Sequence, residues 1–102
     1  MISHIVMLGL AADYDADALA EIMAGLGQLV VAIPGFTGFD HGPNRDFEQK
    51  SPGFPYGFFC RFSDSAALAA YATDPRHHVL GSRLVGLCGR DAGNILVYDI
   101  ES

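Results

Sequence analysis

The stretch YATDPRHH, residues 71–78, decides how this chain is interpreted. An alanine-rich helix over residues 65–73 leads into it, and this helix has to end at Asp74 because a proline disfavours helical geometry in the residue before it. The same Pro75 suits the first position of a new helix, with Asp74 as its N-cap. The stretch therefore predicts two helices separated by a break, not one long helix.

The break places two polar rings near each other. Tyr71 lies at the end of the first helix, and His77 lies in the first turn of the second. A tyrosine and a histidine that face one pocket mouth are seldom needed by a fold, but proton-transfer chemistry often uses them. We therefore take Tyr71 and His77 as the centre of a candidate site.

The sequence on either side of this stretch predicts four strands and one further helix. Apolar runs of strand length lie at residues 3–10, 36–41, 55–62 and 94–100. Between the first two runs, Asp15 is a suitable N-cap, and apolar residues recur at helical spacing until Ile33-Pro34-Gly35 ends the helix. Residues 42–53 are polar and rich in turn formers, which indicates a loop that is either a lid or an ordinary connection.

The order strand, helix, strand, strand, broken helix, strand predicts a ferredoxin-like α+β fold. Such a fold has a four-stranded antiparallel sheet with its helices on one face. The length of 102 residues suits a single domain over residues 1–102. The first and last strands are apolar on both faces, with Ile5 and Met7 on the outer side of one and Leu96 and Tyr98 in the other. We therefore expect a second copy of the chain to cover the open face, giving a homodimer and a dimeric α+β barrel.

Composition excludes several classes of partner. Half of the residues are hydrophobic, only 18% are charged, and the formal net charge is −6. No cluster of Lys and Arg is present, so we expect neither nucleic acid nor an anionic membrane as a partner. The start of the chain does not resemble a signal peptide, and Cys60 and Cys88 have no CxxC motif near them. We expect a cytoplasmic protein with reduced, buried thiols.

Several short motifs, taken in order, carry a family resemblance. They are Ile2-Ser3-His4-Ile5-Val6, Ile33-Pro34-Gly35, Gly42-x-Asn44, Phe62-Ser63-Asp64, Tyr71-x-x-x-Pro75-x-His77 and Val97-Tyr98-Asp99. The ordered set resembles the stress-responsive A/B barrel family, Dabb, over essentially the whole chain. The resemblance implies the same ferredoxin-like dimeric barrel that the apolar pattern predicts.

The family includes stress-induced plant proteins, uncharacterised bacterial proteins and a plant polyketide cyclase that needs no cofactor or metal. By this resemblance, Tyr71 and His77 stand at the catalytic tyrosine and histidine of the cyclase, and His4 matches a pocket histidine on its first strand. Tyr56 stands where the cyclase has a further pocket histidine. The chain departs from the cyclase at that position.

The residues suit an intramolecular aldol closure. His77, near the positive end of a helix dipole, would be neutral and could remove a proton from carbon next to a carbonyl. Tyr71 would donate a hydrogen bond to the enolate oxygen, and His4 and Tyr56 would orient the substrate or the base. The expected walls of the pocket are apolar: Val6, Leu8, Met23, Leu26, Phe58, Ile95 and Val97.

Each site residue also has a structural interpretation. His4 would be a core or interface histidine, Tyr71 a core aromatic bonded to backbone, and His77 a surface residue at a helix start. No metal-ligand spacing and no glycine-rich phosphate loop is present, so we expect no metal and no cofactor. Three functions stay open: a protein that holds a small apolar ligand, a cofactor-free cyclase or lyase, and a cofactor-independent oxygenase of phenols. A collapsed structural module is a fourth interpretation, which a cavity shared by these side chains would exclude.

Overall fold

The computed structural model describes residues 1–89 and 92–102, and its elements follow the predicted order. They are β1 (Ile2–Leu8), α1 (Ala16–Ala32), β2 (Phe36–Pro43), β3 (Tyr56–Phe62), α2 (Ser65–Thr73), α3 (Pro75–Leu87), the short 3-10 helix η1 (Ala92–Asn94) and β4 (Ile95–Glu101). The strands form one sheet in the order β2-β3-β1-β4, and every neighbouring pair is antiparallel. The prediction of a ferredoxin-like α+β fold is confirmed, with the broken helix present as α2 and α3.

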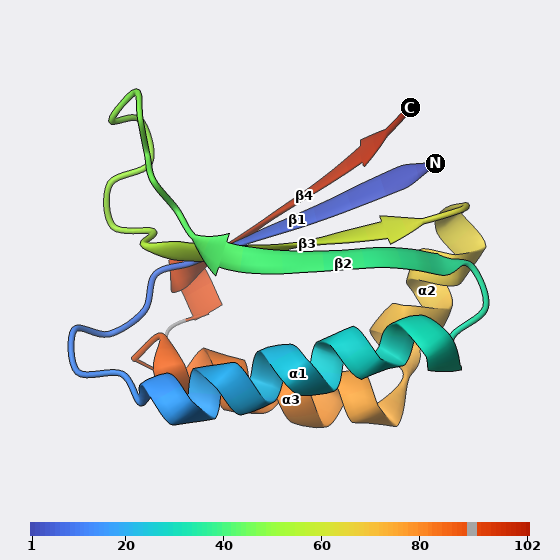
Figure 1. Ribbon diagram of the computed structural model, residues 1–102, viewed down its shortest axis with the longest axis horizontal. Helices are drawn as coiled ribbons and strands as arrows, with labels where there is room; N and C mark the ends of the chain where they lie inside the picture. The colour runs from blue at the N-terminus through green and yellow to red at the C-terminus, as the bar shows by residue number, and fades with distance from the viewer. Residues whose placement is uncertain (90–91) are drawn as a thin grey trace.

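All three helices lie on one side of the sheet, and the other side is bare (Figure 1). Helices α1 and α3 run beside each other under the sheet, while α2 lies at the end where β3 finishes. The core fills the space between these two layers, and its largest fully buried side chains are Tyr71, Phe62, Leu8, Ile22, Met23 and Leu26. No helix in the described part of the chain is long and apolar enough to cross a membrane.

Aspartates fix where the helices begin. Asp15 caps α1 by accepting hydrogen bonds from the backbone N–H groups of Asp17 and Ala18. Asp64 caps α2 in the same way. These side chains satisfy backbone donors that have no partner inside their helix.

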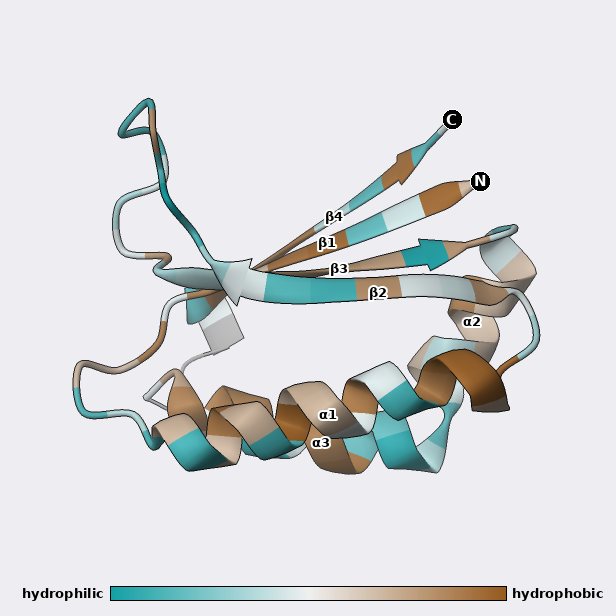
Figure 2. Cartoon of the chain, in the orientation of Figure 1, coloured by the Kyte–Doolittle hydropathy of each residue, from teal (hydrophilic) through white to brown (hydrophobic). Residues whose placement is uncertain are grey.

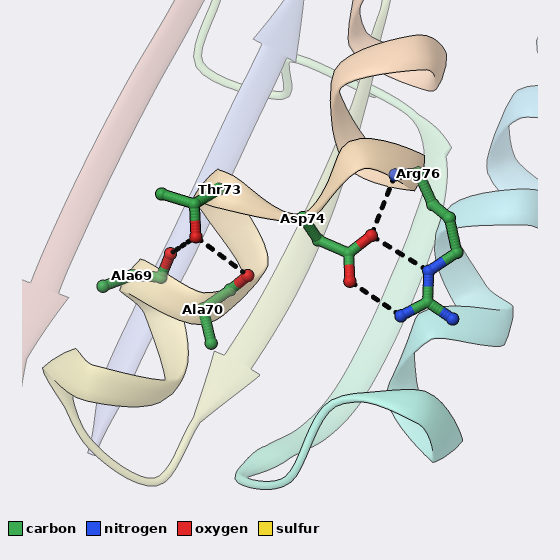
Figure 3. A network of polar contacts seen from close by, with 5 residues as sticks. All are labelled: Ala69, Ala70, Thr73, Asp74 and Arg76. Carbon is green, nitrogen blue, oxygen red and sulfur yellow. Dashed lines mark hydrogen bonds and ion pairs between the residues drawn. The ribbon is translucent and has the colours of Figure 1, made fainter.

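The break between α2 and α3 is built from local hydrogen bonds (Figure 3). Thr73 closes α2 by donating from Oγ1 to the carbonyl of Ala69 at 2.9 Å. Asp74 accepts from the backbone N–H of Arg76 at 2.8 Å, and its two carboxylate oxygens accept from the Arg76 guanidinium at 2.9 and 2.7 Å. Pro75 is the first residue of α3, as predicted, so His77 lies in the first turn.

The strand side chains alternate between the two faces as predicted. Residues paired across antiparallel strands share a face, so Ile5, Phe59 and Tyr98 lie together, as do Met7 and Leu96. We call the bare side the outer sheet face; its apolar members are Ile5, Met7, Phe59, Leu96, Tyr98 and Ile100. Three of them, Leu96, Tyr98 and Ile100, are exposed, and apolar brown bands alternate with hydrophilic teal bands along β4 (Figure 2).

Residues 44–55 connect β2 to β3, and we call them the 44–55 loop. Figure 1 shows this loop standing away from the sheet on the side opposite the helices. The loop is held by its own side chains, because the Asp46 carboxylate accepts from the backbone N–H groups of Lys50 and Ser51 and from the Ser51 hydroxyl. Its position on the bare side means that it does not cover the space between the sheet and the helices.

Candidate functional site

A pocket of about 430 Å³ opens between the sheet and α3. The strands contribute two alternate positions of β1, one of β3 and two alternate positions of β4. The helices contribute the end of α2 and one side of α3. The lining residues are His4, Val6, Phe58, Ala72, His77, His78, Gly81, Ser82, Leu84, Val85, Ile95 and Val97. Two of the proposed catalytic residues and four of the proposed wall residues therefore meet at one pocket.

Tyr71 lies directly behind this lining. Its side chain is 1% exposed, and its ring centroid is 4.3 Å from that of His77 and 5.8 Å from that of His4. Phe36 and Phe62 pack against its other sides, with ring centroids 5.3 and 5.2 Å away. Tyr71 is thus both a core aromatic and a neighbour of the two pocket histidines.

Two buried polar atoms at this place lack a hydrogen-bond partner. Among the described residues, neither the hydroxyl oxygen of Tyr71 nor Nδ1 of His77 has one within ordinary geometry. The Tyr71 hydroxyl interacts with the Cys60 thiol, whose sulfur is a weak hydrogen-bond partner. Buried polar groups are normally paired, so these two atoms mark a place where a water or a ligand group would fit.

His4 is held by a carboxylate on the neighbouring strand. His4 and Asp99 are opposite each other in the β1–β4 register, and Nδ1 of His4 lies 2.5 Å from Oδ1 of Asp99. An ionised carboxylate only accepts hydrogen bonds, so Nδ1 carries the hydrogen and Nε2 is the ring nitrogen that Asp99 leaves unbound. Asp99 therefore fixes the tautomer and the orientation of an imidazole at the pocket.

The surroundings change the protonation of the central residues. Burial lowers the pKa of His77 below its usual range, and the charges of His78 and His4 lower it further, although the backbone of Ala72 opposes this. Burial also raises the pKa of Tyr71 and raises the pKa of Cys60 to about 12. Near pH 7 the site therefore holds a neutral imidazole, which can accept a proton, beside a protonated phenol, which can donate a hydrogen bond.

Not every residue proposed from the sequence reaches this pocket. Tyr56 lies on the helix-facing side, but its hydroxyl bonds to Nδ1 of His41 at 2.5 Å, and neither residue is among those lining the pocket. Leu8, Met23 and Leu26 are fully buried in the core. They belong to the hydrophobic core and do not line the pocket.

The sequence interpretation did not include Asp99 or His78 in the site. The sequence does indicate the side of the sheet on which Asp99 lies, because strand alternation places it on the same face as Val97. Its pairing with His4 depends on the β1–β4 register. His78 is exposed, as its position beside His77 suggests, and it still lines the pocket rim.

The described residues also form other hollows. One of about 310 Å³ lies on the outer sheet face, and one of about 620 Å³ lies between α1 and α3. We place the candidate site in the pocket of His4 and His77, because it is the one bordered by the unpartnered Tyr71 and His77 atoms. Within residues 1–89 and 92–102, no group of three or more His, Cys, Asp or Glu side chains is placed to hold a metal ion.

Solved structures share this architecture. A dimeric ferredoxin-like protein of unknown function from Jannaschia sp. CCS1 is 50% identical, with a TM-score of 0.93 over 99% of this chain and 98% of that one. A hydroxynitrile lyase from Passiflora edulis is 17% identical, with a TM-score of 0.79 over 97% and 90% of the two chains. SnoaB, a cofactor-independent oxygenase from Streptomyces nogalater, is 12% identical, with a TM-score of 0.76 over 99% and 91%. At these lower identities the lyase and the oxygenase show a shared fold only.

Family membership follows from the sequence itself. Among curated proteins, none matches the chain. The family model for the stress responsive A/B barrel domain matches residues 2–102. The chain therefore belongs to the stress responsive A/B barrel (Dabb) family.

Proposed function

We propose that this protein binds a small, largely apolar ligand in the pocket between the sheet and α3. The observation that carries this proposal is the pair of unpartnered buried atoms, the Tyr71 hydroxyl and Nδ1 of His77, beside a pocket with apolar walls. Leaving a buried polar group unpaired costs about 1–3 kcal/mol. A ligand oxygen that enters between the rings of His4 and His77 would remove that cost.

The walls and the volume define the ligand class. Val6, Phe58 and Val97 offer apolar contact, and about 430 Å³ lies in the range of ordinary small-molecule sites. An aromatic ring with one carbonyl or phenolic oxygen fits both properties. The ring would contact the strands, and its oxygen would accept a hydrogen bond from Tyr71.

A matched pair of ligands tests this proposal. Acetophenone and ethylbenzene have nearly the same size, but only acetophenone carries an oxygen acceptor. Calorimetric titration of a panel of aryl ketones and linear poly-β-keto esters, with ethylbenzene as the apolar reference, should show binding to the wild type. Acetophenone should bind more tightly than ethylbenzene. If no member of the panel binds, the pocket proposal fails.

A second candidate function is cofactor-free catalysis at the same pocket. It is favoured by the neutral state that burial imposes on His77 next to a phenol with a raised pKa. The His77 imidazole would take a proton from carbon next to a carbonyl, and the Tyr71 hydroxyl would stabilise the enolate oxygen. In an aldol closure the enolate carbon then bonds to a second carbonyl carbon, and His77 returns its proton to the new alkoxide.

Hydrogen–deuterium exchange tests the first step without knowledge of the natural substrate. Acetophenone in deuterated buffer should exchange its methyl hydrogens faster with the wild type than with His77→Ala, as measured by proton NMR. His41→Ala is the control, because His41 is an exposed histidine that does not line the pocket. Equal exchange in the wild type and in enzyme-free buffer would exclude this catalysis for aryl ketones.

The oxygenase alternative uses the same base on a different substrate. Removal of a phenolic proton by His77 would give an electron-rich phenolate, which then needs molecular oxygen as co-reactant. Oxygen uptake in the presence of a panel of polyhydroxylated aromatics distinguishes this reaction from enolate chemistry. If oxygen uptake continues in His77→Ala, a group other than His77 removes the phenolic proton.

We also propose that the protein is a homodimer through its outer sheet face. The 50% identical structure from Jannaschia sp. CCS1 is described as dimeric, and this face exposes Leu96, Tyr98 and Ile100. Exposed apolar residues gathered on one sheet face are typical of an interface. Analytical ultracentrifugation at micromolar concentration should give twice the chain mass of 10.9 kDa. A mass equal to one chain would contradict the proposal.

A further inference from the structure

We propose that the 44–55 loop is an arm that reaches across the dimer interface and seats the ring of Phe47 on the second copy of the chain. This inference rests on the proposed homodimer. It adds a specific contact that the apolar sheet face alone does not require.

The first observation is the direction of the loop. It leaves the ends of β2 and β3 and stands on the bare side of the sheet, opposite the helices (Figure 1). A partner that covers the outer sheet face would therefore lie beside the loop. The loop contributes no residue to the lining of the His4–His77 pocket, so an arm role does not compete with the site.

The second observation is that the loop is built to hold one shape. Besides its three bonds to the Asp46 carboxylate, the Asn44 side chain accepts from the backbone N–H of Asp46 and donates to the Ser51 hydroxyl and the carbonyl of Phe54. Asp46 and Gln49 both have positive φ, at 46° and 57°. Left-handed backbone at residues other than glycine is retained where the surrounding contacts impose it. These hydrogen bonds hold the loop in one conformation.

The third observation is the apolar ring that this rigid loop presents. Phe47 is 86% exposed. The guanidinium of Arg45 lies over its ring, 5.6 Å from the ring centroid. Aromatic residues next to arginine are typical anchors in protein interfaces.

The fourth observation is the distribution of charge. In the described part of the chain, Arg76 pairs with Asp74 and Arg83 with Glu21, both on the helical side. Arg45, Lys50 and Arg61 form no ion pair among these residues. All three lie on the loop or on the outer sheet face. In a two-fold dimer the partner presents this same face, and a carboxylate available to these cations is that of Asp40, which lies beside the hollow on the outer sheet face.

The fifth observation is the surface at the base of the loop. The hollow of about 310 Å³ on the outer sheet face is lined by Ile5, Met7, Asp40, His41, Gly42, Pro43, Asn44, Gly57, Phe58 and Phe59. It joins the start of the 44–55 loop to the apolar middle of the sheet. A second copy that rests on the sheet would thus touch the loop through one continuous surface.

A single-tryptophan variant reports the contact directly, because the chain contains no tryptophan. Phe47→Trp should emit at shorter wavelength at concentrations where the protein is dimeric, and the emission should shift to that of an exposed indole on dilution. Val31→Trp is the control, since Val31 is 92% exposed on α1 and should show exposed emission throughout. Exposed emission from Phe47→Trp in a solution shown to be dimeric would overturn the arm.

The dimer dissociation constant gives the second measurement. Phe47→Ala should raise it at least about tenfold by sedimentation equilibrium, because a two-fold dimer contains the contact twice. Val31→Ala should leave it unchanged. A dimeric wild type whose dissociation constant is insensitive to Phe47→Ala overturns the arm and leaves the homodimer standing, whereas a monomeric wild type removes both.

Discussion

The ring of His77 packs on the ring of Tyr71 with 4.3 Å between centroids, although the two residues belong to different helices. In one continuous helix, residues six apart point about 120° away from each other around the axis. The break at Asp74 and Pro75 changes the direction of the chain between them and lets both side chains turn toward the sheet. The pair therefore depends on the break and not on helical spacing.

Tyr71→Phe separates the structural role of Tyr71 from its proposed role in binding. The variant keeps the ring among Phe36, Phe62 and His77 and removes a hydroxyl that has no ordinary hydrogen-bond partner. The free energy of unfolding should be unchanged within about 1 kcal/mol or should rise, because removing an unpaired buried polar group is not costly. Urea denaturation measures this.

The same variant should weaken acetophenone binding by about tenfold and leave ethylbenzene binding unchanged, since only acetophenone accepts a hydrogen bond. Both affinities come from calorimetric titration. A loss of several kcal/mol in stability would instead assign the hydroxyl to the core. Equal effects on both ligands would exclude a hydrogen bond to the ligand oxygen.

His77 should make stability depend on pH in a defined window. Burial lowers its pKa in the folded protein below the ordinary value of 6.5, so the unfolded chain binds the proton more tightly. The neutral ring therefore adds stability that is fully present above pH 6.5 and is lost as the pH falls through the folded pKa. Denaturant midpoints measured from pH 7.5 downward should fall in this range for the wild type.

His77→Gln should flatten this dependence, and His41→Gln is the control. His41 is an exposed histidine on β2 that is not among the groups acting on His77, so its replacement should leave the pH curve as in the wild type. A wild-type curve retained in His77→Gln would show that another group titrates in this window.

The sequence predicted those features that depend on local chemistry. The caps at Asp15 and Asp74, the break at Asp74 and Pro75, and the alternation of strand faces are present as expected. Each depends on one residue type at one position, such as a side chain that accepts backbone N–H groups or a ring that fixes φ.

The sequence did not predict how deeply a side chain is buried or which residues pair across neighbouring strands. Alternation places Leu8 on the helix-facing side, but how far it lies from the pocket depends on the packing of α1, and Leu8 is in the core. Tyr56 faces the helices too, yet it binds His41 on β2. The β2–β3 pairing contains an irregularity between Phe36 and Gly38, which sequence alternation does not reveal.

Gly35 is the position where a methyl group should do most harm. It ends the turn after α1 with φ of +84°, and an added Cβ would lie 2.7 Å from both the Cβ of Ala67 and the Oγ of Ser63. Gly35→Ala should lower the free energy of unfolding by at least about 2 kcal/mol, because neither the backbone nor the space suits it. Gly86→Ala, in α3 with open space around it, should raise it by about 0.5–1 kcal/mol. If both variants changed the free energy of unfolding in the same direction, the strain expected at Gly35 would be contradicted.

Asp99→Asn should reduce ligand affinity or hydrogen exchange more than it reduces the free energy of unfolding. Asp99 is half exposed, with 47% of its side chain accessible, and exposed ion pairs contribute only about 0–1 kcal/mol to folding. A neutral amide can still bond to His4, but it no longer requires the hydrogen on Nδ1. The imidazole then samples both tautomers, and its Nε2 no longer has one fixed role at the pocket.

We therefore expect Asp99→Asn to leave urea denaturation within about 1 kcal/mol of the wild type and to lower aryl ketone affinity or exchange rate severalfold. The His4→Gln, Asp99→Asn double variant should be no worse in function than His4→Gln alone, because Asp99 acts through His4. Nitrogen NMR of the His4 ring reports the tautomer directly and would not change if Asp99 had only a structural role. Additive losses in the double variant would show that Asp99 acts on the ligand independently of His4.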